Sequence, residues 1–235
     1  MSATISETHE FSVGEGARLE IQNRAGNVTI ARGSGGQVRV VVTKRTRGLF
    51  GSASEADLQK LRVEVTQSGD TVNITTERGV DWSLFKQVTV DLDITAPEAV
   101  ELDLRLNAGN IRVSDTVGGV RAEVNAGNLD LIGVTIGGSS RLSVNAGNLT
   151  VRGTLTEGAS LDASVNAGNA RFTFPADAGI AVEGRTTAGS IHSSVEQIGV
   201  SRHFASASAS GTLGTARGSR LRATVDAGNL SFDAS

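Results

Sequence analysis

The sequence contains no cysteine and no tyrosine, and only 3% of its 235 residues are aromatic. A chain without cysteine has neither a disulfide nor a thiolate zinc site. With so few aromatics, the interior has to be built from valine, leucine, isoleucine and alanine. The net charge is only −3, and acidic and basic residues are interspersed. The absence of a basic face and of a stacking series of aromatics argues against nucleic-acid binding.

Long hydrophobic runs are also missing. No apolar stretch approaches the roughly eighteen residues that a membrane-spanning helix needs. The residues after Met1 are polar and lack the basic and then apolar segments of a secretory signal. The sequence therefore predicts a cytoplasmic protein. A location at the surface or membrane stays open, because a chain trimmed of its leader or anchor would look the same.

Glycine is abundant, with 29 residues, and it recurs in a repeated motif. From Gly109 to Gly189 the motif glycines are 18, 20, 21 and 21 residues apart, and the next step, to Gly228, is 39 residues. That step is about twice the others, so we expect a degenerate copy of the motif at 211–213. A fixed period near twenty residues indicates a repeat architecture. The motif is Asn-Ala-Gly-Asn at 107–110, 125–128, 145–148 and 166–169, with looser copies around Gly26, Gly189 and Gly228.

On both sides of each motif glycine, apolar and polar residues alternate with period two, which is typical of half-buried strands. One repeat is therefore a strand, a tight turn, a second strand and a looser turn. Because each strand has a single apolar face, a repeat can bury that face only against neighbouring repeats. We predict an all-β fold, a β-solenoid of stacked two-strand coils of about 20 residues. Parallel stacking should place Asp103 beside Arg121, Arg105 beside Glu123, Arg141 beside Asp162, and Glu183 near Arg222.

The whole chain, 1–235, is expected to form one elongated domain. Strands and irregular loops are predicted over 8–97, and regular repeat coils over 98–235. The N-terminal part should contain strands at 18–22, 28–30, 37–44 and 88–94, a hairpin formed by 61–66 and 71–76, and a short helix near 54–60. An irregular insert is expected at 45–54.

We assign a structural role to the repeated turn. Glycine tolerates positive φ at little cost and asparagine is the next most tolerant residue. Stacked asparagine amides can hydrogen-bond along the axis of the repeats. Calcium binding is the alternative, but calcium-binding repeats are rich in aspartate and this corner carries neutral asparagine. We predict no metal site and no cofactor, and assign the turns to Gly26, Gly109, Gly127, Gly147, Gly168, Gly189, Gly228, Asn107, Asn110, Asn125, Asn128, Asn145, Asn148, Asn166 and Asn169.

Taken in order, these motifs resemble a known family. The chain is similar to the bacterial putative-adhesin, β-strand-repeat domains of otherwise unknown function. The resemblance implies a β-solenoid-like fold and carries no catalytic residues. It rests on Phe11 with Leu19-Glu20-Ile21, on Gly26-Asn27-Val28, on the strand from Val88 to Pro97, on the repeated corners, and on the segment from Gly214 to Gly228-Asn229-Leu230.

No pattern of catalytic residues stands out. The histidines at 9, 192 and 203 are far apart, and neither a nucleophile elbow nor a phosphate-binding loop is present. Two loops, at 44–52 and 81–85, break the repeat instead. Loops on a rigid scaffold often bind partners. They either form one partner-binding patch or cap the open end of the stack. Their candidate partner-binding residues are Arg45, Arg47, Leu49, Phe50, Trp82 and Phe85.

The sequence therefore predicts a non-enzymatic structural or interaction protein, a scaffold or adhesin-like module that binds a protein or envelope partner. The alternative is a polymer-forming, cytoskeletal-type solenoid that resembles bacterial bactofilins. An enzyme or a metal-binding repeat is disfavoured, because no polar cluster interrupts the pattern. Since the last coil ends at Ser235 without a covering helix, self-association through open solenoid ends is also predicted.

Overall fold

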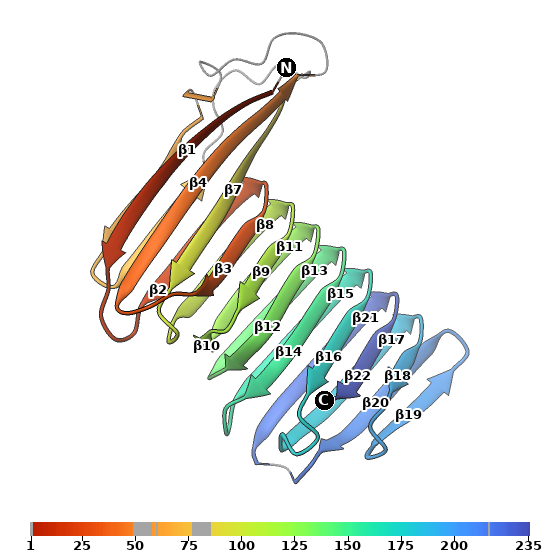
Figure 1. Cartoon of the computed structure of the whole chain (residues 1–235). Coiled ribbons are helices and arrows are strands. Elements are labelled where there is room, and N and C mark those ends of the chain that lie inside the picture. The colour runs from red at the N-terminus through yellow and green to blue at the C-terminus, as the bar shows by residue number, and fades with distance from the viewer. Residues whose placement is uncertain (1, 49–57, 60, 77–85, 216) are drawn as a thin grey trace.

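The structure, a computed structural model, describes residues 2–48, 58–59, 61–76, 86–215 and 217–235. Its strands form two eleven-stranded sheets that lie face to face (Figure 1). The predicted all-β class is confirmed. Within the described residues, no helix has the length and apolar character needed to cross a membrane.

The strands of the N-terminal region are β1 (Ser2–Ser12), β2 (Arg18–Ala25), β3 (Val28–Arg32), β4 (Gln37–Gly48), β5 (Val63–Ser68), β6 (Thr71–Thr76) and β7 (Lys86–Ala96). The repeats supply β8 (Glu101–Ala108), β9 (Ile111–Ser114), β10 (Val117–Gly118), β11 (Val120–Ala126), β12 (Leu129–Ile136), β13 (Ser139–Ala146), β14 (Leu149–Leu155), β15 (Ser160–Ala167) and β16 (Ala170–Phe174). The C-terminal part adds β17 (Ile180–Ala188), β18 (Ile191–Ser193), β19 (Ile198–His203), β20 (Ser206–Leu213), β21 (Ser219–Ala227) and β22 (Leu230–Ala234).

Each repeat sends one strand into each sheet. The first sheet, called sheet A, has the order β1-β4-β7-β3-β9-β12-β14-β16-β22-β18, with β10 paired to β12. The second, sheet B, has the order β19-β20-β17-β21-β15-β13-β11-β8-β2-β6-β5. Strands of neighbouring repeats pair in parallel, as in β8 with β11 and β13 with β15. A tight corner after each sheet B strand leads directly into the sheet A strand of the same repeat.

The outward side chains confirm the predicted register. Asp103 is paired with Arg121, and Arg105 with Glu123, across β8 and β11. Arg141 is paired with Asp162 across β13 and β15. Neighbouring opposite charges stabilise a sheet by a few tenths of a kcal/mol per exposed pair. The backbone register therefore agrees with the one that the corner glycines define, and it also places Arg121 opposite Arg141.

The core is a continuous layer of buried aliphatic side chains between the two sheets. Buried and exposed residues alternate along the strands, as in β8 and β15. Three phenylalanines concentrate at one place in this layer. The ring centroids of Phe172 and Phe232 are 5.9 Å apart, and those of Phe172 and Phe174 are 6.4 Å apart. All three side chains are fully buried, so this cluster joins β16 to β22.

The last repeat of the chain does not lie at the end of the stack. Strand β21 pairs with β15 on one side and with β17 on the other. Strand β22 likewise lies between β16 and β18, as Figure 1 shows. The expectation of an open final coil that ends at Ser235 is therefore wrong. The repeat order in space differs from the order in sequence.

Charge and packing explain this order. Arg222 of β21 stands between Asp162 and Glu183 in the register, and its Nη2 lies 3.3 Å from Glu183 Oε2. In sequential order the two carboxylates would stand side by side, and like charges across strands are destabilising. Gly184 of β17 leaves room for Phe232, whose ring carbons would lie 2.8 Å from a methyl group there.

The prediction of a degenerate corner motif at 211–213 is also wrong. Gly211 belongs to β20, which pairs antiparallel with β17, so no corner forms there. Strand β19 then pairs antiparallel with β20. This hairpin covers the outer edge of β17 in sheet B. Its tip is tied to the final corner, because Gly189 N donates a 3.1 Å hydrogen bond to the Ala205 carbonyl.

The N-terminal region matches its prediction in part. The hairpin of β5 and β6 is confirmed. The prediction of an irregular insert at 45–54 is wrong for its first residues, because β4 continues to Gly48 and pairs with β1 and β7. Residues 2–12, which lack a strong hydrophobic alternation, form the full-length strand β1. Of the short helix expected near 54–60, only Leu58 and Gln59 are described, and both are helical.

Candidate functional site

The corner glycines form one column along an edge of the molecule. Gly26, Gly109, Gly127, Gly147, Gly168, Gly189 and Gly228 have φ between 127° and 156°, a region that side-chain-bearing residues rarely adopt. They also stack closely. A methyl group on Gly127 would overlap the carbonyl oxygen of Gly109, and the same holds for Gly147 above Gly127. Each corner thus leaves no space for a side chain.

The asparagine that follows each corner glycine forms a second column. In Asn148, both the backbone N and Nδ2 donate to Asn128 Oδ1, at 3.0 and 3.1 Å. Asn169 makes the same pair of bonds to Asn148 Oδ1, at 3.2 and 3.1 Å. The column runs in space through Asn27, Asn110, Asn128, Asn148, Asn169, Asn229 and Ser190. Its amides are therefore committed to bonds within the chain.

Asp91 starts this column. Its Oδ1 accepts a 2.8 Å hydrogen bond from Asn27 N, and its Oδ2 lies 3.0 Å from Arg45 Nη1. Arg45, one of the candidate partner-binding residues, is thus placed on β4 in an ion pair at the first corner. A third column consists of the asparagines before each Ala-Gly pair: Asn107, Asn125, Asn145 and Asn166 are joined by side-chain bonds of 2.9, 2.6 and 2.9 Å.

The side chains of the other candidate partner-binding residues lie outside the described part of the structure. Arg47 belongs to β4, where only its backbone is described. Leu49, Phe50, Trp82 and Phe85 lie outside the described residues. The structure therefore neither brings the two loops together nor separates them, and their joint patch stays a prediction.

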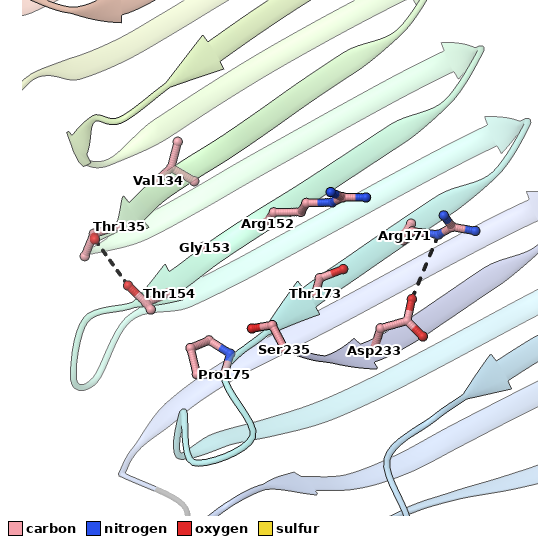
Figure 2. A pocket seen from close by; sticks show the side chains of 11 residues that line it. Val134, Thr135, Arg152, Gly153, Thr154, Arg171, Thr173, Pro175, Asp233 and Ser235 are labelled. Carbon is pink, nitrogen blue, oxygen red and sulfur yellow. Dashed lines mark hydrogen bonds and ion pairs between the residues drawn. The ribbon is translucent and has the colours of Figure 1, made fainter.

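A trough crosses the outer face of sheet A, where the sequence suggested no site. It has a volume of about 520 Å³ and spans β12, β14, β16 and β22 (Figure 2). Arg152 and Arg171 rise from neighbouring strands, and Asp233 faces Arg171. Its lining residues are Gly133, Val134, Thr135, Arg152, Gly153, Thr154, Arg171, Thr173, Pro175, Asp233 and Ser235.

The two arginines differ in their partners. Arg171 Nε lies 3.9 Å from Asp233 Oδ2 and donates a 3.4 Å hydrogen bond to Ser231 Oγ. Its side chain is 60% exposed, so the guanidinium keeps donors directed to solvent. Arg152 has no ion pair within 4 Å among the described residues. Figure 2 shows both side chains extending in the same direction over the sheet.

Glycines and a bulge form the floor of the trough. The register between β12 and β14 shifts between Ile132 and Val134, and Gly133 adopts φ 68°. A methyl group on Gly153 would overlap the Val134 carbonyl oxygen. Gly153 thus allows β14 to approach β12 closely beside the bulge. Thr135 and Thr154 hydroxyls lie 3.2 Å apart across its end.

A second hollow of about 690 Å³ adjoins the trough and shares Arg152 and Arg171 with it. It extends toward the second asparagine column and reaches His192. His192 is paired in register with Ser231, which is paired with Arg171. His192 is exposed on the outer face. Together the two hollows form a band of hydroxyl, amide and guanidinium groups.

This arrangement is suited to binding. Among the described residues, no group of three or more acidic, histidine or cysteine side chains could hold a metal ion. The polar groups repeat at the strand spacing of about 4.8 Å. Guanidinium groups favour carboxylates and phosphates through paired hydrogen bonds. An extended polar chain with anionic groups matches such a surface better than a compact small molecule, which normally needs an enclosed apolar pocket.

No protein-family model matches this chain, and no curated protein matches it in sequence. Solved structures resemble it over nearly its full length. A putative cell adhesion protein from Clostridium sporogenes has a TM-score of 0.50 and 12% identity, with 98% of this chain and 100% of that chain covered. A putative adhesin from Bacteroides fragilis has a TM-score of 0.42 and 10% identity, with 97% of each chain covered.

The likeness to the clostridial protein places this chain in a structural class. It shares the fold of that protein, which is named as a putative cell adhesion protein. The resemblance that the sequence motifs indicated is confirmed at this level. At 12% identity the comparison concerns the fold alone, so what the chain binds has to be argued from its own surface.

Proposed function

We propose that this chain is a non-enzymatic β-solenoid scaffold, an adhesin-like module that binds an anionic polymer of the cell envelope along the outer face of sheet A. The observation that carries the proposal is the trough with Arg152 and Arg171. Its length across four strands suits a chain-like ligand. The stacked corners support it as well, because hydrogen-bonded columns hold the rows of polar groups at fixed spacing.

The ligand class follows from the groups that are present. Arg152 supplies a guanidinium without an ion-pair partner among the described residues, and Arg171 shares its charge with Asp233. Carboxylate or phosphate groups on the polymer would pair with the two arginines. Sugar hydroxyls would exchange hydrogen bonds with threonine and serine side chains such as Thr173 and Ser231.

Co-sedimentation with isolated bacterial cell envelopes tests this function. The wild-type protein is expected to sediment with the envelopes, and the double variant Arg152→Ser/Arg171→Ser to lose roughly tenfold or more in affinity. Two charge-assisted contacts of about 1 kcal/mol each correspond to such a loss. Binding should also weaken as salt is raised, because screening reduces contacts between exposed charges.

A matched control is available on the opposite face. Arg121 and Arg141 are adjacent, exposed arginines of sheet B, so Arg121→Ser/Arg141→Ser removes the same charge without touching the trough. This variant is expected to bind as the wild type does. Equal losses in both double variants would show that net charge matters and the trough does not, and a wild-type protein that stays in the supernatant would exclude an envelope partner. Cell fractionation would test the predicted cytoplasmic location in parallel.

A further inference from the structure

Strand β1 forms the outermost edge of sheet A (Figure 1). It is eleven residues long and, within the part of the chain that the structure describes, pairs only with β4. One side of β1 therefore presents a long row of backbone donors and acceptors to solvent. Proteins normally shorten, cover or pair such edges, because they are templates for another strand.

The two sheets end unevenly at this edge. Sheet A continues for three strands beyond β3, whereas sheet B continues for only two beyond β2. Among the described residues, sheet A thus has one strand more than sheet B at this edge, and side chains on the inner face of β1 are partly exposed. Ile5 and Phe11 on this face are only half-buried. Between them, the side chains of Glu7 and His9 are 44% and 35% exposed.

We propose that two copies of this chain associate through β1, which pairs antiparallel with the partner's β1 so that the two copies of Thr8 face each other across a two-fold axis. Sheet A then becomes continuous through both copies. The interface is isologous, because the same strand serves on both sides. It uses no residue of the trough, so this proposal and the proposed function can fail independently.

Side-chain matching selects this register. With Thr8 opposite Thr8, Glu7 of each copy faces His9 of the other, and Ile5 faces Phe11. On the outer side Ser6 faces Glu10. Aromatic with aliphatic pairs and acidic with basic pairs are the favourable cross-strand combinations. Every opposing pair in this register is neutral or complementary.

The neighbouring registers are worse. A shift of two residues in one direction places Glu7 opposite Glu7, and like charges directly opposite destabilise a sheet. The opposite shift places Glu7 against Phe11 and His9 against His9. A shift by one residue would turn the inner face of one copy to the outer side of the other. The proposed register is therefore the one that the sequence of β1 favours.

Glu7 does not block this pairing. A charged side chain on the inner face of an edge strand normally discourages pairing. Here Lys44 Nζ of β4 lies 2.9 Å from Glu7 Oε1 and the Lys44 side chain is only 8% exposed, so a cation of the same chain offsets part of the charge of this carboxylate. At the opposite end of the molecule the edge strands are β18, with three residues, and β19, with six. Because short edges offer few backbone bonds, β1 is the favoured edge.

The absence of cysteine allows a direct test by cross-linking. Thr8 is exposed on the outer face, so Thr8→Cys should leave the fold intact. The two cysteines would then lie directly opposite each other. Opposite residues of an antiparallel pair have Cα atoms roughly 4.5–5.5 Å apart, within the range of about 4.4–6.8 Å that a disulfide requires. Mild oxidation should give a covalent dimer. Ser6→Cys is the matched control, because its two copies would be about 13 Å apart along the strands and should stay uncross-linked.

Sedimentation of charge variants gives an independent readout. The wild type should show a concentration-dependent monomer–dimer equilibrium. Thr8→Lys places two ammonium groups at the axis and should raise the dimer dissociation constant roughly tenfold or more. Ser6→Lys adds the same charge opposite Glu10 and should keep the dimer or tighten it. Circular dichroism would verify that both variants are folded.

The outcomes decide the proposal. A wild type that is monomeric at all concentrations overturns it, as does equal cross-linking of the two cysteine variants. Filaments in the electron microscope would also overturn it, because β1 pairing closes after two copies. Should Thr8→Lys fail to fold, the cysteine pair still decides between the registers.

Discussion

Deletion of residues 219–235, which form the β21–β22 repeat, is expected to unfold β17, β18 and the β19–β20 hairpin, while β8 to β15 keep their structure. The reason is the position of this repeat in the middle of the stack. Without it, β17 loses its parallel partner β21 and β18 loses β22. Removal of a terminal repeat would eliminate only one interface, because the stability of stacked repeats is approximately the sum of the repeats' own stabilities and of the interfaces between neighbouring repeats.

Hydrogen exchange measured by mass spectrometry checks this result. Peptides from 180–213 should exchange at nearly the rate of an unfolded chain, whereas peptides from β11 and β13 serve as the internal control and stay protected. Protection of 180–213 in the shortened protein would contradict the order in space. It would mean that β17 pairs directly with β15, as the sequential order requires.

Gly147→Ala is expected to lower the free energy of unfolding by about 3–5 kcal/mol, the combined effect of backbone strain and a steric overlap. Gly147 has φ 144°, and a methyl group there would overlap the carbonyl oxygen of Gly127. On the other side the corner is held by a hydrogen bond, since Gly147 N donates to the Ala167 carbonyl at 2.9 Å. The neighbouring repeats would have to move apart.

Gly158→Ala is the matched control. Gly158 also has positive φ, at 71°, but a methyl group there meets no atom within 4 Å. Only the conformational cost applies, about 1 kcal/mol. Urea unfolding of both variants separates the two contributions. A loss at Gly147 no larger than at Gly158 would show that stacking of the corners is not what requires glycine.

The corners could be read from the sequence, whereas the trough could not. Corner glycines recur at a fixed spacing with the same neighbours, so a single chain displays them. The outward position of Arg171 carries Thr150 in the neighbouring repeat, and that of Arg152 carries Ile132. Their neighbourhood depends on the register between strands and on the bulge at Gly133.

The edge strand β1 shows a second limit of the sequence. Its residues from Ser2 to Ser12 are mostly polar, and the strand exists because β4 supplies eleven backbone partners in register. Hydrophobic alternation contributes little there, since serine and glutamate are frequent and only Ile5 and Phe11 are large apolar residues. Pairing within a sheet is a tertiary effect, so a polar edge strand is easily missed.

The sequence by itself determined which side chains face inward, where each repeat turns and which residues allow the turn. These properties follow from period-two alternation and from steric demands on single residues, which are local. The tertiary structure decided the order of the repeats and the surface that they form. Strand β21 could have joined either side of β17, and the choice depended on contacts between distant residues. Arg222 separates two carboxylates, and Phe232 packs against Phe172 beneath Gly184.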